Sequence, residues 1–183
     1  FTKKNIYTGL YSSLTDYYKN KTLPEKRKKQ FLFAGQLISR KNVLSLIKAF
    51  KLANLKNNDW KLIMVGNGNL KIKKKLLGAN IHLIKNLQPE QLAKLYNESL
   101  FFILPSLRDH WPLVVHEASL CGCNLLLSNN IGNIPDLSNK KNSIIFDPKS
   151  IFSIQQAIEK GMKLKGKKLL QGNKESEKLA KKF

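Results

Sequence analysis

The sequence is poor in cysteine, and its two cysteines form no recognisable framework. Cys121 and Cys123 are the only cysteines among 183 residues. They lie too close together in sequence for an ordinary structural disulfide, and the three histidines do not stand at zinc-binding spacing from them. A disulfide-stapled scaffold is therefore excluded and no metal site is expected. Both thiols are predicted to be small buried groups in a reducing compartment.

Long apolar runs are also missing. No run approaches the roughly 18 residues that a membrane-crossing helix needs, and no signal-peptide pattern follows Phe1. We therefore expect a cytoplasmic protein. A chain of 183 residues that is 42% apolar is long enough to bury one substantial core, which favours a single domain.

Acidic residues are scarce, with 12 aspartates and glutamates against 33 lysines and arginines and a net charge of +21. The excess is concentrated at the ends, since residues 1–30 hold 8 basic and 2 acidic side chains and residues 160–183 hold 9 and 2. Because aromatic residues are not interleaved with the terminal lysines, nucleic-acid binding is disfavoured. Three explanations stay open: peripheral contact with the inner face of an anionic membrane, a solvated surface, and a coding bias toward lysine.

Between the basic ends, six apolar segments alternate with segments of helical spacing. This alternation predicts an α/β fold: a Rossmann-like parallel six-stranded sheet with helices on both faces. The expected strands are 31–37, 60–65, 81–84, 100–104, 124–127 and 143–146. Two expected helices begin after a cap at Asn42 and at Pro89, and three more cover 70–77, 112–121 and 151–162. We assign 31–165 to this domain, 1–30 to an irregular basic leader and 166–183 to a Lys-rich helical tail.

The junctions between strands and helices are expected to form one ligand-binding edge. In parallel sheets of this kind the ligand crevice lies beyond the carboxyl ends of the strands. The five junctions that would line it are 35–41, 66–68, 85–88, 105–111 and 128–132.

The helix predicted at 112–121 has clear start and stop signals. Proline suits the first turn of a helix and glycine suits the position after its end, which matches Pro112 and Gly122. The first backbone N–H groups of a helix lack intrahelical acceptors and carry the positive end of the helix dipole, so they favour an anion. Those groups belong to Leu113, Val114 and Val115.

Two carboxylates flank this predicted anion site, which makes a phosphate-binding site between carboxylates our first hypothesis. Asp109 precedes the helix, and Glu117 lies one turn beyond its start. Because the neighbours of Glu117 are apolar, its carboxylate needs hydrogen-bond donors. Sugar hydroxyls would serve, and a salt bridge or an exposed position is the alternative. His110 and His116 flank the same site, and we expect a structural role rather than catalysis for both.

Two other junctions carry candidate ligand-binding residues. Arg40 and Lys41 could together neutralise a diphosphate, with a solvated helix start as the alternative. Gly66-Asn67-Gly68 matches part of a dinucleotide-binding fingerprint, but the third glycine and the following acidic residue are missing. A turn alone is a sufficient reason for both glycines.

The order of these motifs resembles the carboxyl-terminal, nucleotide-sugar-binding half of the group 1 retaining glycosyltransferases, over about residues 25–165. The matching pieces are Phe33-Ala-Gly-Gln-Leu, Arg40-Lys-Asn, Leu46-Ile-Lys-Ala-Phe, Leu62-Ile-Met-Val-Gly-Asn-Gly, Asp109 followed after seven residues by Glu117, and Gly132-Asn-Ile-Pro-Asp. The resemblance implies one half of a GT-B fold and a nucleotide diphosphate sugar as donor. It also implies that no metal or other cofactor is needed and that anomeric configuration is retained.

The resemblance further implies roles for single residues. Lys41 matches the lysine that contacts the donor diphosphate, Glu117 matches the carboxylate that holds the ribose hydroxyls, and Asp109 stands where the family has a glutamate that contacts the donor sugar. These three are the expected catalytic residues. The donor-binding set adds residues expected to meet the base, the phosphates and the sugar: Gly35, Gln36, Arg40, Gly66, Gly68, Ile84, Asn86, Leu87, Trp111, Leu113 and Val114.

The chain departs from the family pattern at three positions. Gln36 replaces a common arginine, Asp109 is one methylene shorter than glutamate, and Lys85 stands where glycine is common. One alternative is therefore a degenerate, non-catalytic relative, and another is a basic module that binds nucleic acid or an anionic membrane. In the family, a preceding amino-terminal half binds the acceptor, so we expect a glycan or lipid-linked acceptor, as in polysaccharide or lipopolysaccharide synthesis, to require a half that this chain lacks.

Overall fold

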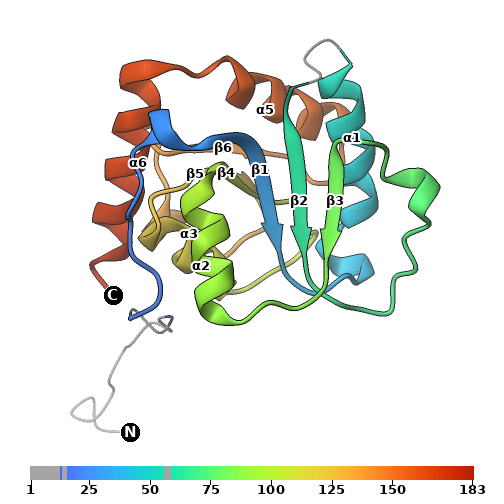
Figure 1. The fold of residues 1–183 in the computed structure, drawn as a ribbon, viewed down its shortest axis with the longest axis horizontal. Coiled ribbons are helices and arrows are strands. Elements are labelled where there is room, and N and C mark those ends of the chain that lie inside the picture. Colours follow the sequence, from blue (N-terminus) through green and yellow to red (C-terminus); the bar gives the residue numbers. More distant parts are fainter. Residues whose placement is uncertain (1–12, 14–15, 56–58) are drawn as a thin grey trace, which may run out of the picture.

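A computed structural model describes residues 13, 16–55 and 59–183. Within them a six-stranded, wholly parallel sheet has the order β3-β2-β1-β4-β5-β6 (Figure 1). The strands are β1 Lys28–Ala34, β2 Lys61–Val65, β3 Ile81–Ile84, β4 Ser99–Leu104, β5 Asn124–Ser128 and β6 Ser143–Phe146. The predicted α/β, Rossmann-like sheet is therefore confirmed.

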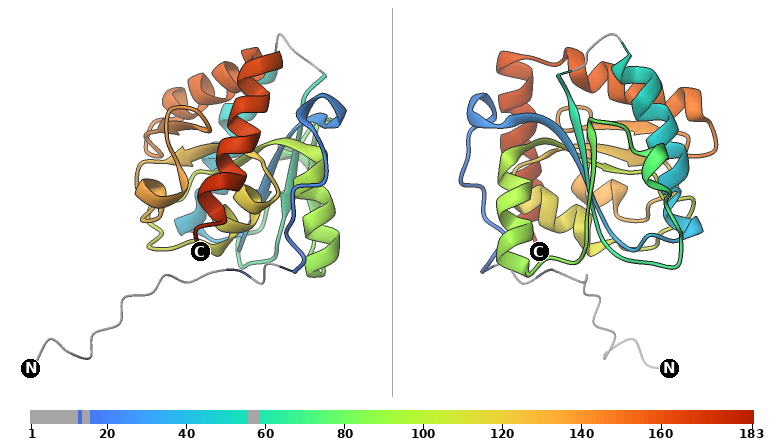
Figure 2. Two further views of the ribbon diagram at one scale, coloured as in Figure 1. Left: turned by 90° about the vertical axis from the view of Figure 1, so that its left-hand side faces the viewer. Right: turned by 45° about the vertical axis from the view of Figure 1, so that its right-hand side comes forward.

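Helices cover both faces of the sheet, as predicted. On one face α1 (Val43–Asn54) packs against α5 (Ile151–Lys163), and on the other α3 (Leu113–Leu120) packs against both α2 (Pro89–Glu98) and α6 (Gly166–Ala180) (Figures 1 and 2). The short helix α4 (Ile134–Leu137) follows β5. Three 3-10 turns complete the description: η2 Pro24–Lys26, η3 Ser39–Lys41 and η4 Lys74–Leu76.

The core is built from aromatic and branched apolar side chains on both faces of β1 and β4. Phe31 stacks on Phe101 with ring centroids 5.2 Å apart and lies 5.0 Å from Trp60. On the opposite face Phe102 lies 5.8 Å from Tyr96 of α2. A parallel sheet covered on both sides requires such continuous apolar strands, and the resulting core holds the carboxyl ends of the strands in fixed positions.

The first predicted strand was displaced and one predicted helix was wrong. β1 ends at Ala34 rather than at residue 37, because Gly35 adopts φ +150° and Leu37 donates its N–H to the carbonyl of Asn67 instead of to the sheet. The segment 70–77 contains only the turn η4, not a helix. It lies in a connection bounded by glycines and rich in like-charged lysines, both of which disfavour a helix.

Smaller corrections concern helix starts. Asn42 does precede α1, but its side chain makes no capping bond; the residue is left-handed at φ 55° and its Nδ2 donates to the Pro148 carbonyl at 2.7 Å. Pro112 is the N-cap of α3 rather than its first residue. Gly122 ends that helix with φ +71°, as its sequence position predicted.

The basic ends pack onto the domain in the described part of the chain. Arg27 is buried, and α6 lies along α3 rather than apart from it. Cys121 and Cys123 are free and buried, as predicted. The division into leader, domain and tail at residues 30 and 165 stays a prediction, since packing contacts cross both boundaries.

Candidate functional site

The loops at the carboxyl ends of the strands are hydrogen-bonded to one another. Leu37 donates its N–H to the Asn67 carbonyl at 2.8 Å, and Leu107 donates to the Arg40 carbonyl at 2.9 Å. Asp109 in turn donates its N–H to the Asn130 carbonyl at 3.1 Å. The predicted junctions thus form one continuous edge, at the arrow tips in Figure 1.

The two glycines after β2 are required by loop packing. A Cβ on Gly66 would lie 1.9 Å from the Gly35 carbonyl oxygen, and a Cβ on Gly68 would lie 2.1 Å from that of Leu37. Any side chain would push the β1 and β2 loops apart. The turn interpretation therefore suffices for these glycines, and they need no dinucleotide fingerprint.

A cavity of about 340 Å³ opens at this edge. Its size falls within the roughly 300–1,000 Å³ of small-molecule sites. It is lined by Ala34, Gly35, Gln36, Val65, Gly66, Asn67, Asn86, Leu87, Leu92 and Val114. Six of these belong to the predicted donor-binding set, so the fold gathers residues from three strand ends, α2 and α3 around one hollow.

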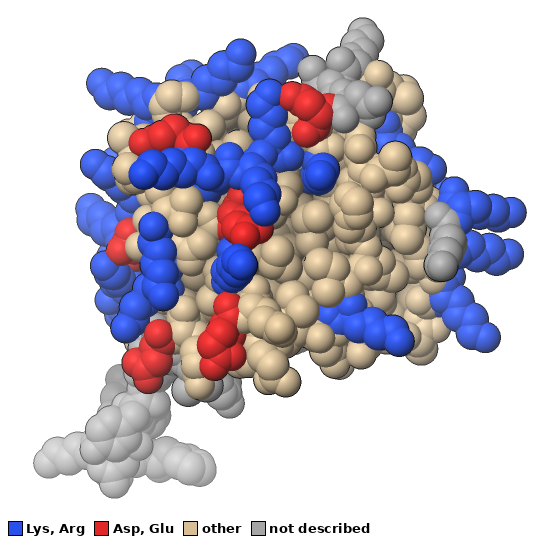
Figure 3. All heavy atoms as spheres, in the orientation of Figure 1, with Lys and Arg blue, Asp and Glu red and all other residues tan. Residues whose placement is uncertain are grey.

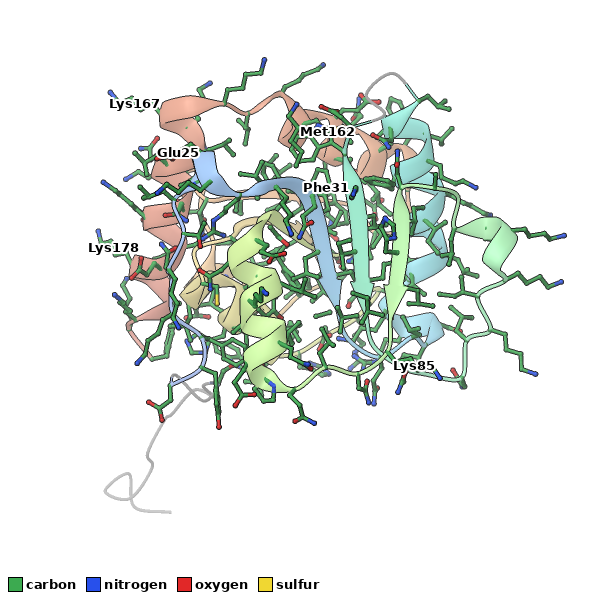
Figure 4. All side chains as sticks on the ribbon, in the orientation of Figure 1. Glu25, Phe31, Lys85, Met162, Lys167 and Lys178 are labelled. Carbon is green, nitrogen blue, oxygen red and sulfur yellow. The ribbon has the colours of Figure 1, made fainter. Side chains whose placement is uncertain are left out.

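Other predicted residues lie outside the lining of this cavity. Gly68 packs against Leu37 in the loop that follows β1. The main-chain carbonyl of Ile84 accepts the Gly66 N–H at 3.0 Å. The rings of Trp111 and Phe183 form a T-shaped pair with centroids 6.2 Å apart. Lys85 is exposed at the same edge of the molecule (Figure 4) and does not line the cavity.

Lys41 and Asp109 form an ion pair beside this cavity. Lys41 is 8% exposed, and its Nζ lies 2.5 Å from Oδ2 of Asp109. The guanidinium of Arg40 lies 3.6 Å from the other carboxylate oxygen and donates to the Arg108 carbonyl at 3.0 Å. Both predicted diphosphate cations thus face the carboxylate predicted to contact the sugar.

The amino end of α3 presents two backbone N–H groups. Within the described residues, those of Leu113 and Val114 have no acceptor. Val115, which we also expected to be free, donates to the Pro112 carbonyl at 3.0 Å, so this part of the prediction was wrong. The structure leaves two anion-binding groups at the helix start, and Val114 lines the cavity.

Glu117 sits half-buried on α3 and is held by a tyrosine. The Tyr96 hydroxyl donates to its Oε2 at 3.1 Å, and its Oε1 accepts nothing from the described residues. Burial raises the pKa of the Glu117 carboxyl above its ordinary value, and the Tyr96 bond offsets part of that rise. Glu117 forms no salt bridge with a described residue and is not fully exposed, so neither of the two alternative interpretations holds for it. Nothing in the sequence pattern pointed to Tyr96 beyond its place on an apolar helix face.

His116 joins three parts of the chain. Its Nδ1 accepts the Ser13 N–H at 3.0 Å, and its Nε2 lies 3.0 Å from the Ala180 carbonyl. With both nitrogens engaged and 1% of its surface exposed, His116 has the structural environment that we expected. His110 is exposed, and its carbonyl lies against Gly132.

Comparison with known proteins identifies the family to which the chain belongs. The family model described as "Glycosyl transferases group 1" matches residues 15–181. An uncharacterized glycosyltransferase of Haemophilus influenzae is 29% identical over 162 residues, which are 86% of this chain and 46% of that protein. The chain therefore belongs to the group 1 glycosyl transferase family, and it spans about half the length of that relative.

Two solved structures show which part of the family fold the chain represents. The carboxyl-terminal domain of a group 1 glycosyl transferase from Francisella tularensis superposes with a TM-score of 0.77 at 16% identity, covering 92% of this chain and 96% of that one. An E. coli trehalose-6-phosphate structure bound with UDP-2-fluoro glucose gives a TM-score of 0.73 at 13% identity, covering 87% of this chain and 41% of that one. The fold is thus one half of a GT-B architecture.

Two further observations concern membrane-spanning helices and metal sites. None of the helices in the described ranges combines the length and the apolar character that crossing a bilayer demands. Among the same residues, no group of three or more histidine, cysteine, aspartate or glutamate side chains is placed to hold a metal ion. Metal independence stays a prediction from the family resemblance.

Proposed function

We propose that this domain binds a nucleotide diphosphate sugar at the carboxyl edge of its sheet. The observation that carries the proposal is that Val114 of α3 and Gly35 both line the cavity. The N–H groups of Leu113 and Val114 have no acceptor among the described residues, Gly35 lies against the Lys41 side chain, and Glu117 follows one turn along α3 from Leu113. The base would lie against residues 84–87, the diphosphate at the start of α3, and the ribose hydroxyls against Glu117.

In the whole protein we propose transfer of the donor sugar with retention of configuration. The N–H groups of α3 and the Lys41 ammonium would stabilise the departing diphosphate, which is where such a site gains most of its rate. Asp109 would lie nearest the sugar. The acceptor, a glycan or a lipid-linked sugar, would be bound by a second half in the cytoplasm or at the inner membrane surface, so the isolated domain is expected to bind donor without transferring it.

The calorimetric test begins with a panel of common nucleotide diphosphate sugars titrated into the domain. Substitution Leu113→Pro then removes one N–H group from the first turn, a position that tolerates proline. We expect donor affinity to fall about tenfold, the lower end for a hydrogen bond to a charged group. Leu113→Ala, which keeps the N–H, should bind like the wild type. Failure of every donor in the panel to bind would refute the proposal.

The ion pair at the site predicts opposite effects for its two members. Because Asp109 forms an ion pair with Lys41, a diphosphate that binds Lys41 must compete with this carboxylate. Asp109→Asn should therefore raise affinity for the nucleoside diphosphate roughly tenfold, while Lys41→Ala should lower it at least tenfold. Lys48→Ala, an exposed lysine of α1, serves as the charge control. Equal affinities of the Asp109→Asn variant and the wild type would contradict the competition.

A further inference from the structure

A second cavity lies at the opposite, amino edge of the sheet. It has a volume of about 450 Å³ and occupies the space between the starts of β4, β5 and β6, the end of α5 and the start of α6. Its apolar floor contains Phe101, Leu125, Ile144 and Leu164. The length of a strand separates it from the donor site, so it is not an extension of that site.

Five lysines line this cavity, and we call it the lysine pocket. They are Lys140, Lys141, Lys160, Lys163 and Lys168. They come from three separate segments, namely the connection before β6, the last turns of α5 and the first turn of α6. Lysines and arginines crowd this upper edge and the α6 side in Figure 3, and the labelled Lys167 projects from the same corner in Figure 4.

No carboxylate lines the lysine pocket, and none of its five lysines forms an ion pair with a described residue. Two acidic residues on its elements accept hydrogen bonds from uncharged side chains rather than from these lysines, Glu159 from Gln155 and Glu175 from Asn139. The five positive charges therefore repel one another across the hollow.

A helix dipole explains only part of this charge. Lys160 and Lys163 lie near the carboxyl end of α5, where a cation is favoured. Lys168 lies in the first turn of α6, where a cation is disfavoured and where no acidic residue compensates. Lys140 and Lys141 precede β6 and belong to no helix. The dipoles of α5 and α6 thus do not account for three of the five lysines.

We propose that the lysine pocket binds a small ligand that carries two or more phosphate charges. A concave site of this volume fits a small molecule or a headgroup better than a nucleic-acid polymer, which needs an extended stripe with base-stacking aromatics. The apolar floor would meet the carbon part of the ligand, and the lysines at the rim would pair with its phosphates. The inference is independent of donor binding at the other edge.

Inorganic diphosphate titrated into the isotope-labelled domain tests the proposal by NMR. We expect amide shifts to cluster at residues 140–144 and 160–171, with saturation. The triple variant Lys141→Gln, Lys163→Gln, Lys168→Gln should weaken diphosphate binding at those amides about tenfold. The matched control neutralises three exposed lysines that do not line this pocket, Lys71→Gln, Lys73→Gln, Lys75→Gln, and should change it by less than twofold.

A vesicle assay separates the two sources of such a ligand. Flotation with phosphatidylcholine vesicles that contain phosphatidylglycerol and cardiolipin, lost in the pocket variant but not in the control, identifies a lipid headgroup. Diphosphate binding without vesicle binding identifies a soluble phosphorylated ligand. The proposal is overturned if diphosphate shifts no pocket amide, if the control variant weakens binding as much as the pocket variant, or if only a single-stranded RNA binds at the lysines.

Discussion

Replacing Glu117 by glutamine is expected to weaken donor binding about 100-fold while making the folded domain more stable at neutral pH. Two charge-assisted hydrogen bonds to ribose hydroxyls, at roughly 1.5 kcal/mol each, give the binding loss. The stability gain follows because burial raises the Glu117 pKa, so that the ionised carboxyl opposes folding. Glutamine has no charge to desolvate and still offers an oxygen to the Tyr96 hydroxyl.

The two effects have distinct pH dependences. A group whose pKa is raised by folding favours the folded state below its ordinary pKa, and that contribution is lost as the pH rises through the raised pKa. The stability difference between Glu117→Gln and the wild type should therefore shrink as the pH falls below the ordinary carboxyl range. Wild-type donor affinity should decline as Glu117 is protonated, because the neutral carboxyl is a weaker acceptor.

Calorimetry and denaturant unfolding measure these effects, with Glu159→Gln on α5 as the matched control. A donor analogue that lacks both ribose hydroxyls should bind the variant and the wild type equally. If Glu117→Gln weakened the analogue as much as the natural donor, the ribose assignment would be wrong. If the variant were less stable than the wild type at neutral pH, the burial argument would fail instead.

Replacing Arg27 by methionine is expected to lower the free energy of unfolding by roughly 3 kcal/mol or more. The buried guanidinium donates to three main-chain carbonyls of distant segments, those of Tyr96, Ser99 and Cys121, at 3.1, 3.0 and 2.6 Å. It also donates to the Thr22 carbonyl and the Asn20 side chain. Methionine fills much of the volume but leaves several acceptors buried and unpaired, at roughly 1–3 kcal/mol each.

Chemical denaturation of Arg27→Met beside Lys26→Met measures this loss. The neighbouring Lys26 is exposed, so the control removes the same charge without removing a buried donor. Arg27→Lys should recover part of the stability, because an ammonium reaches fewer carbonyls than the planar guanidinium fork. Equal midpoints for Arg27→Met and Lys26→Met would show that water replaces the guanidinium without cost.

Sequence patterns predicted the sheet because its central strands are continuous apolar runs and most of the crossovers between strands are helical. The same patterns failed at 70–77, where the helical spacing of Leu70 and Leu77 lies in a connection with only one 3-10 turn. They also could not show that Arg27 differs from the lysines beside it. Burial of that guanidinium depends on carbonyls supplied by residues about 70 to 95 positions away, which no local pattern contains.

Local motifs predicted only those features of the candidate site that lie within one segment of the chain. Helix geometry predicted the N–H groups of Leu113 and Val114, which have no acceptor among the described residues, and loop geometry accounts for the turn glycines. The pairing of Lys41 with Asp109 joins two loops 68 residues apart, and the bond from Tyr96 to Glu117 joins two helices. Both depend on strand order, so they required the folded structure.

The hydrogen bonds that tie the carboxyl-edge loops together have a consequence for ligand entry. Because the Leu37–Asn67, Leu107–Arg40 and Asp109–Asn130 bonds join main-chain groups of the domain itself, folding alone is enough to immobilise the backbone of these loops. Binding then loses little loop entropy, which is the general advantage of pre-organisation. Association should accordingly be a single fast step without a slow rearrangement of this half, and any closing motion should involve whole domains rather than these loops.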